Sequence, residues 1–250
     1  MPSPPHLPPE LEYDIFLLAF HNDPKNERNL VLVAKRVFDW LIPHRFHIVT
    51  LSDSDGESYP IEFNETTYQR YGHHVRHLFI QELRVAADLD LFPNVVNLGF
   101  WIDYEPTHLP FLLKLPLTRI SADPSPELFQ VFSNVTHLDL LSLDISLDEI
   151  TSVLHLPKLT HVCVMCDISH SALNLFLEKE RCPGLRVVVL WSIGVSSPVL
   201  GEHEGMKTDD KRIVLVRCAP SEDWQTGARG GLDMWKFAEQ VIASRNVPGT

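Results

Sequence analysis

A six-residue pattern, apolar-x-x-apolar-x-apolar, recurs seven times in the chain. Its copies are Val75–Ile80, Val95–Phe100, Leu117–Ala122, Val135–Leu140, Leu159–Val164, Leu185–Leu190 and Ile213–Cys218. Their first residues lie 18 to 28 residues apart, a period typical of stacked structural units. Because one such unit cannot bury its own apolar side, each must pack on its neighbours. The repeat therefore predicts an array with one continuous core. It favours a function in recognition, through the surface of the array, over an enzymatic function.

Amphipathic segments between the later copies predict that strands and helices alternate, which favours an α/β fold with a parallel sheet. Ile150, Val153 and Leu154 follow Asp148 at helical spacing, and Leu173, Phe176 and Leu177 follow a candidate Ser169 cap. We expect the array to span residues 46–250, beginning with a strand at 46–51. Trp235, Ala238, Val241 and Ile242 predict a closing helix that caps the open end of the stack. The charged segment 194–211 is expected to be a mobile insertion.

The central apolar residue of each copy is predicted to be buried, in one line across the sheet. These residues are Leu78, Leu98, Ile120, Leu138, Val162, Val188 and Val216. Side chains between the apolar positions should face an open side of the sheet and form a target-binding surface. Its predicted members are His77, Phe79, Asn97, Trp101, Arg119, His137, Asp139, His161 and Trp191. The two tryptophans serve equally well as partner anchors or as covers of the sheet edge.

Residues 1–45 have a different pattern and predict a small helical head. Pro8 and Pro9 suit a first helical turn, and Leu7, Leu11, Ile15 and Leu18 follow at helical spacing as far as about Phe20. A second apolar segment at 30–40 has the same period, and Pro43 should end it.

Composition excludes some classes of function. A net charge of −12 repels phosphate backbones, so we expect no nucleic-acid partner. No apolar run reaches the length of a membrane span, and we expect no membrane association. Four cysteines without a disulfide-dense pattern suit a reducing compartment, so a cytoplasmic or nuclear location is expected.

The sequence gives little support for a metal site, a redox site or a nucleotide site. His137, Asp139, His161 and Cys163 would lie on adjacent strands, close enough for one zinc ion, but side chains on a flat sheet point in parallel. Cys163 and Cys166 have metal or redox spacing, yet a strand sends them to opposite faces. Glycines at 201–205 and 227–231 lack the strand-then-helix setting of a nucleotide site. We expect no metal, no cofactor and no enzymatic activity; a metal-assisted enzyme at His137 and His161 is the weak alternative.

Two segments of the head resemble the F-box. Leu7-Pro-Pro-Glu-Leu11 with Ile15 and Leu18 is similar to its first helix, and Leu32-Val-Ala-Lys-Arg36 with Phe38-Asp-Trp40 is similar to its second contact. The downstream array resembles the divergent leucine-rich repeats that accompany F-boxes. The Thr-His strands and the segment 222–235 resemble the large F-box-like families of mushroom-forming fungi. Ala34 stands where cysteine is usual, and the repeats lack a regular asparagine.

The resemblance implies a substrate adaptor of an SCF-type ubiquitin ligase. The head would bind a Skp-family adaptor through Leu7, Pro8, Leu11, Ile15, Leu18 and Val33, and the leucine-rich-repeat-like solenoid would bind an unknown protein target. The same side chains are needed for the head's own core, and about half are expected there. The alternative function is a solenoid interaction module unconnected with ubiquitination, whose head only caps the array.

Overall fold

The computed structural model describes residues 7–23, 26–51, 65–81, 89–102, 105–123, 125, 128–142, 145–178, 180–193, 199–200 and 210–246. The α-helices are α1 (Pro9–Asn22), α2 (Glu27–Leu30), α3 (Lys35–Arg45), α4 (Glu65–Tyr71), α6 (Leu109–Leu112), α7 (Leu147–Leu154), α8 (His170–Leu177), α9 (Pro220–Ala228) and α10 (Met234–Arg245). Short 3₁₀ helices are η2 (Gly72–His74), η3 (Leu89–Leu91), η4 (Pro106–His108) and η5 (Leu128–Asn134). The predicted insertion at 194–211 lies largely outside the described residues.

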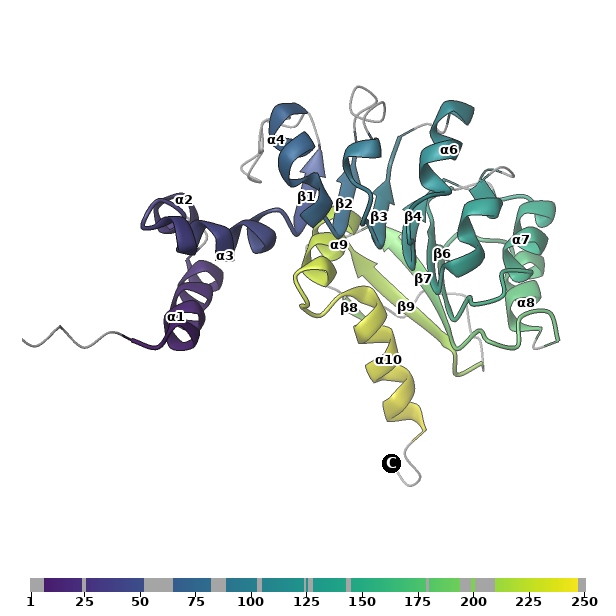
Figure 1. Cartoon of the computed structure of the whole chain (residues 1–250). Coiled ribbons are helices and arrows are strands. Elements are labelled where there is room, and N and C mark those ends of the chain that lie inside the picture. The colour runs from purple at the N-terminus through teal and green to yellow at the C-terminus, as the bar shows by residue number, and fades with distance from the viewer. Residues whose placement is uncertain are drawn as a thin grey trace, which may run out of the picture.

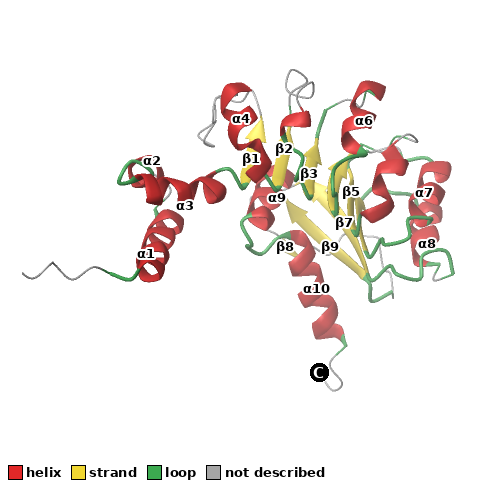
Figure 2. Ribbon diagram, in the orientation of Figure 1, coloured by secondary structure: helices red, strands yellow, loops and turns green. Residues whose placement is uncertain are grey.

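One sheet organises the array (Figures 1 and 2). Its strands are β1 (Ile48–Leu51), β2 (His77–Ile80), β3 (Asn97–Phe100), β4 (Arg119–Ala122), β5 (His137–Leu140), β6 (His161–Met165), β7 (Val187–Ile193), β8 (Val199–Leu200) and β9 (Ile213–Cys218). They lie in the order β1-β2-β3-β4-β5-β6-β7-β9-β8, and every pair is parallel except β8 with β9. The predicted α/β fold with a parallel sheet is confirmed.

The central apolar line is confirmed for six of its seven members. Leu78, Leu98, Ile120, Leu138, Val162 and Val188 are consecutive partners across β2 to β7, and all are buried. The seventh position is wrong, because Val188 pairs with Ile213 and Val216 pairs with Trp191. An odd shift in register moves a side chain to the other face of a sheet. The run from Ile213 to Val216 is apolar throughout, so the pattern could not specify its register.

Both faces of the sheet are covered. The larger apolar core lies between one face and α4, α6, α7 and α8, with Tyr68, Leu112, Ile150 and Leu173 buried from those helices. On the other face, Met234, Trp235 and Ala238 of α10 pack with β6, β7 and β9 around Trp191 and Val189. The helix predicted at 235–242 therefore exists, but it packs across the sheet instead of capping the end of the stack. The expectation of a cap at the end of the stack is therefore wrong, because the apolar residues of α10 are buried against this face of the sheet.

Capping signals define the two predicted crossover helices. Ser146 accepts a hydrogen bond from the Glu149 backbone N–H, and the Glu149 carboxylate accepts one from the Ser146 backbone N–H at 2.8 Å, which starts α7. Ser169 accepts from the Ala172 backbone N–H at 3.2 Å and starts α8, as the sequence predicts.

The head contains α1, α2 and α3 around a small core of Phe20, Val31, Val37 and Leu41. The helix predicted from about Leu30 is α3, and it starts only at Lys35, because the Ala34 backbone is extended. Pro43 lies inside the last turn of α3 and does not end it at once, so the predicted stop is two residues too early. The proline removes one backbone hydrogen-bond donor from α3, and only two helical residues follow it.

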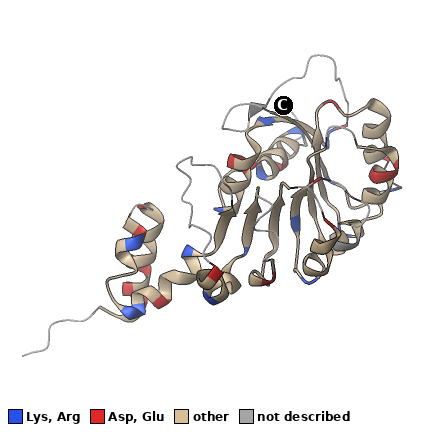
Figure 3. Ribbon diagram, turned by 90° about the horizontal axis from the view of Figure 1, so that it is seen from above, with Lys and Arg blue, Asp and Glu red and all other residues tan. Residues whose placement is uncertain are grey.

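The distribution of charge over the described residues shows no single-sign face. Figure 3 shows Lys and Arg residues interspersed with Asp and Glu residues over the helices and loops. No helix among the described residues is long and apolar enough to cross a membrane.

Candidate functional site

The predicted target-binding residues lie in two neighbouring rows across the sheet. His77, Asn97, Arg119, His137 and His161 are consecutive partners on β2 to β6. The next row on the same face is Phe79, Gly99, Ser121, Asp139 and Cys163. The alternation of side chains along each strand therefore brings these residues to one face, as predicted.

That face is covered by α9 and α10, which lie on the side of the sheet opposite α4, α6, α7 and α8 (Figure 1). The Trp224 ring of α9 lies 5.1 Å from the Phe79 ring and 6.4 Å from the His77 ring. Trp235 of α10 meets His137 and His161 edge to face, at 5.3 and 5.8 Å between ring centres. Aromatic side chains of the two helices therefore occupy the surface expected for a target.

Polar contacts fix the same two helices to the sheet. Arg119 on β4 forms an ion pair with Asp233 at 3.3 Å, and Asp233 also accepts a hydrogen bond from the Lys236 backbone N–H at the start of α10. His161 contacts the Glu239 carboxylate of α10 at 3.2 Å. Asp233 is the N-cap of α10, so one carboxylate both starts the helix and attaches it to the sheet.

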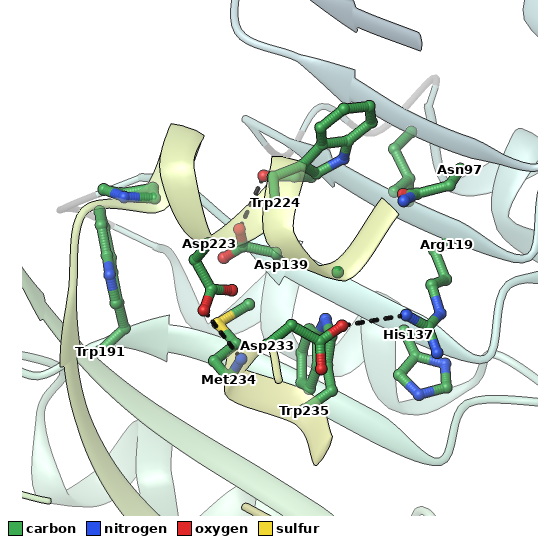
Figure 4. Close-up of a pocket in the computed structure, with 14 residues that line it drawn as sticks. Asn97, Arg119, His137, Asp139, Trp191, Asp223, Trp224, Asp233, Met234 and Trp235 are labelled. Carbon is green, nitrogen blue, oxygen red and sulfur yellow. Dashed lines mark hydrogen bonds and ion pairs between the residues drawn. The ribbon is translucent and has the colours of Figure 1, made fainter. Parts of the chain in front are cut away.

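A chain of hydrogen bonds runs beneath α9. The Trp101 indole N–H donates to the Ser121 hydroxyl at 2.9 Å. That hydroxyl donates to Asp139 Oδ2 at 2.7 Å, and Figure 4 shows the Asp139 carboxylate. The second oxygen, Asp139 Oδ1, is buried without a hydrogen-bond partner. Burial raises the pKa of Asp139 to about 6, although the bond from Ser121 acts in the opposite direction.

A second buried carboxyl group, Asp223 on α9, faces the same region. Its Oδ1 accepts a hydrogen bond of 2.9 Å from the backbone N–H of Met234, the first residue of α10. Burial raises the pKa of Asp223 to about 7, with smaller contributions from the charges of Asp233 and Asp139. The two carboxyl groups lie close together in Figure 4. A protonated acid is the favoured state of such groups at mildly acid pH.

The two histidines of the row are stacked, with ring centres 4.0 Å apart and an angle of 9° between the rings. Burial lowers the pKa of His137 to about 2 and lowers the pKa of His161, so both rings are neutral at neutral pH. Parallel rings do not direct their nitrogens at one central ion. Among the described residues no group of three or more His, Cys, Asp or Glu side chains could hold a metal ion.

A small cavity of about 30 Å³ remains between the sheet and α9 and α10. Its lining includes Arg119, His137, Asp139, Asp223 and Trp224. A volume of this size holds one or two water molecules and no metabolite, because about 10–15 Å³ is needed per water by this measure. The cavity therefore lies within an intramolecular interface that contains buried polar groups.

The expectation of an open sheet face is thus wrong. Phe79, Asn97, Asp139, His161 and Trp191 are buried, and His77, Trp101, Arg119 and His137 are half-buried. Sequence reasoning missed the residues that cover them, Asp223, Trp224, Asp233 and Trp235. A signal was present: Val187, Val189 and Val214 occupy the supposedly open face, and apolar residues there predict a cover.

The cysteines follow the strand alternation that the sequence predicts. Cys163 is fully buried on the face covered by α10, whereas Cys166 is partly buried against the larger core of the opposite face. Burial raises the pKa of the Cys163 thiol well above its ordinary value. All four cysteines are free, so Cys163 and Cys166 form no disulfide with each other.

The six head residues assigned to adaptor binding are all exposed. Leu7, Leu11, Ile15 and Leu18 are 51–63% exposed on or beside α1, Val33 is 61% exposed, and Pro8 is exposed at the N-cap. The expectation that about half would form the head's core is wrong. A second apolar stripe of α1, with Phe16, Leu17 and Phe20, faces inward and supplies that core instead. Helix α1 is apolar on two sides.

Comparisons with protein families, curated proteins and solved structures found no match to this chain.

Proposed function

We propose that the chain is a non-enzymatic protein-recognition protein, an F-box-like substrate adaptor of an SCF-type ubiquitin ligase. Its helical head binds a Skp-family adaptor, and its α/β array contacts a protein target. The observation that carries this proposal is the exposed apolar stripe of α1, made of Leu11, Ile15 and Leu18. These side chains coincide with the positions that resemble the adaptor contact of an F-box.

The concentration of exposed apolar residues in the head supports a docking function. Nine large apolar side chains are exposed among the described residues, and six of them belong to the head: Leu7, Leu11, Ile15, Leu18, Leu32 and Val33. The remaining three, Leu113, Leu147 and Leu232, are dispersed over the array. Exposed apolar residues gathered on one small unit favour a protein interface over a solvated surface.

The closed sheet face supports recognition through its rim rather than through its centre. Part of the His77, Trp101 and Arg119 side chains remains accessible beside α9, and the Arg119 side chain is 33% exposed. The cavity is small, which favours a function in protein recognition over an enzymatic function on a small molecule. We assign the target contact to this rim, within the residues predicted from the sequence.

The alternative function is an interaction module unconnected with ubiquitination. The same apolar stripe supports it, because exposure defines a docking surface without naming its occupant. The two functions differ in one respect, namely whether the occupant of α1 is a Skp-family protein.

Binding of a purified Skp-family adaptor to the full chain tests the proposal. Leu11→Ala with Ile15→Ala should weaken this binding at least about 30-fold, because a few apolar anchors dominate such interfaces. Both side chains are more than half exposed, so the variant should melt at the temperature of the unmodified chain. Leu113→Ala with Leu147→Ala is the matched control, with exposures of 51% and 53% on the array.

Adaptor binding that survives the head variant would place the contact elsewhere. A folded full chain that binds no Skp-family adaptor would contradict the ligase function and leave the interaction module.

A further inference from the structure

The interface between α9 and the sheet carries acidic groups from both sides. Asp139 comes from β5 and Asp223 from α9, both are buried, and both line the same small cavity (Figure 4). Asp139 Oδ1 has no hydrogen-bond partner, and Asp223 has the Met234 backbone N–H as its donor. Two ionised carboxylates in this position would repel each other without a neutralising cation.

The surrounding groups do not supply that neutralisation. Besides the two carboxyl groups, the cavity is lined by three charged or titratable residues, Arg119 on β4, His137 on β5 and Asp233 before α10. The titratable groups next to these residues are His161 and Cys163 on β6, Cys218 on β9 and Glu239 on α10. Arg119 is already paired with Asp233, and burial keeps His137 neutral by lowering its pKa. Burial raises the pKa of both thiols, so they stay protonated.

Helix α9 makes fewer apolar contacts with the sheet than α10 does. Met234, Trp235 and Ala238 attach α10 to an apolar core on β6, β7 and β9. From α9, by contrast, Trp224 contacts Phe79 and His77, and its indole N–H is buried without a partner. An unsatisfied buried donor subtracts from the stability of a contact.

Short non-helical segments flank α9 on both sides. Ala219 and Pro220 lie at its start, and Gly230, with φ 81°, turns the chain after its end. A left-handed conformation is natural for glycine, and Lys236 Nζ donates a hydrogen bond to the Gly230 carbonyl oxygen at 2.6 Å. The nine residues of α9 therefore lie between the extended Ala219 and the turn at Gly230, while α10 is anchored by its own apolar contacts.

We propose that α9 is a proton-controlled lid over the polar rows of the sheet, closed when Asp139 and Asp223 are protonated and released when they ionise. Release uncovers His77 and Phe79 and gives the Asp139 and Asp223 carboxylates access to water. The lid does not depend on whether the head binds an adaptor. It makes the accessible area of the sheet face a function of pH.

The direction of the effect follows from the pKa values. A carboxyl group with a raised pKa in the closed state binds its proton more tightly there, so protonation stabilises closure. That stabilisation is present at low pH and is lost as pH rises from the ordinary value of 3.8 toward about 7 for Asp223 and about 6 for Asp139. For Asp223 alone, the opening equilibrium should increase roughly 30-fold between about pH 5.5 and about pH 8.

Hydrogen exchange of the full chain at these two pH values tests the lid. Once released from the sheet, the nine-residue α9 is too short to keep its helical hydrogen bonds. Protection factors, which correct for the intrinsic exchange rate, should therefore fall roughly 30-fold for amides 223–229 on going from the lower to the higher pH. Amides of α10 from Ala238 onward and of β5 should change by less than about threefold. Equal protection of α9 at both values would overturn the proposal, and so would a loss shared by β5, which indicates global unfolding.

Variants separate the lid from other pH effects. Asp223→Asn keeps an oxygen acceptor for Met234 and should remove most of the pH dependence of α9. Glu222→Gln, an exposed neighbour on the same helix, is the matched control and should keep it. Asp139→Asn is a second variant that acts from the sheet side if Asp223→Asn does not fold. If α9 exchange still depends on pH in the folded Asn variants, Asp223 and Asp139 are not the groups that control the lid. Exchange of the unmodified chain by itself decides whether α9 opens as pH rises.

Discussion

The imidazole rings of His137 and His161 are stacked 4.0 Å apart, and the ring of Trp235 covers both edges. The two rings contact each other and leave no common point at which their nitrogens converge. We predict that the purified protein carries no stoichiometric zinc. Elemental analysis should give much less than one zinc per chain, and His137→Gln with His161→Gln should not change that content. About one zinc per chain that disappears in the double variant would restore a metal site.

Leu138 lies at the centre of the apolar line and is completely buried. Its replacement with Ala should lower the free energy of unfolding by about 2–5 kcal/mol, because the truncation leaves a cavity in the core. Urea denaturation measures the loss. Leu147→Ala, at a site 53% exposed, is the control and should change the free energy by less than about 0.5 kcal/mol. A similar loss in both variants would contradict the assigned core.

The half-buried histidines predict acid sensitivity. Burial lowers the pKa of His77 to about 4 and that of His137 to about 2, whereas an unfolded chain protonates them near 6.5. A base with a lowered folded pKa makes folding less favourable as pH falls below 6.5, because the unfolded state binds more protons. His137→Gln should reduce this loss between about pH 6 and about pH 4.

The free energy of unfolding at several pH values measures this effect as a difference from the unmodified chain. That difference is needed because Asp139 and Asp223 stabilise the folded state over the same fall in pH. His155→Gln, at an exposed position, should leave the dependence unchanged. An identical slope in the unmodified chain and His137→Gln would refute the role of His137.

Gly99 is required by the ring of Phe79. A Cβ at position 99 would lie 2.2 Å from Phe79 Cδ2, and the Trp101 and Trp224 rings confine Phe79 at 4.9 and 5.1 Å. Gly99→Ala should therefore lower the free energy of unfolding by roughly 1–3 kcal/mol. In a Phe79→Leu background the same substitution should cost less, since the ring is absent. A double-mutant cycle measures the difference, and additive losses would show that the ring is not responsible.

The repeat pattern was sufficient to predict a parallel sheet and six of the partners of its central line. Leu78, Leu98 and Leu138 share a slot because apolar period and register impose the same condition on each unit. Val216 escaped prediction because its neighbours are apolar too. The cover over Asp139 also escaped, since contacts between distant segments such as α9 and β5 leave no local period. The apolar Val187 and Val189 were the available indication of a cover.

Helix α3 belongs to two cores at once. Val37 and Leu41 are buried in the head, Ile42 is buried in the core of the sheet, and Phe38 packs against both. Because a single continuous helix joins them, the angular phase between the face of α1 and the array is set by the number of residues in α3. One inserted residue would rotate the head by about 100° and displace it by about 1.5 Å. The length of α3 therefore fixes the orientation, relative to the array, of any protein that binds α1.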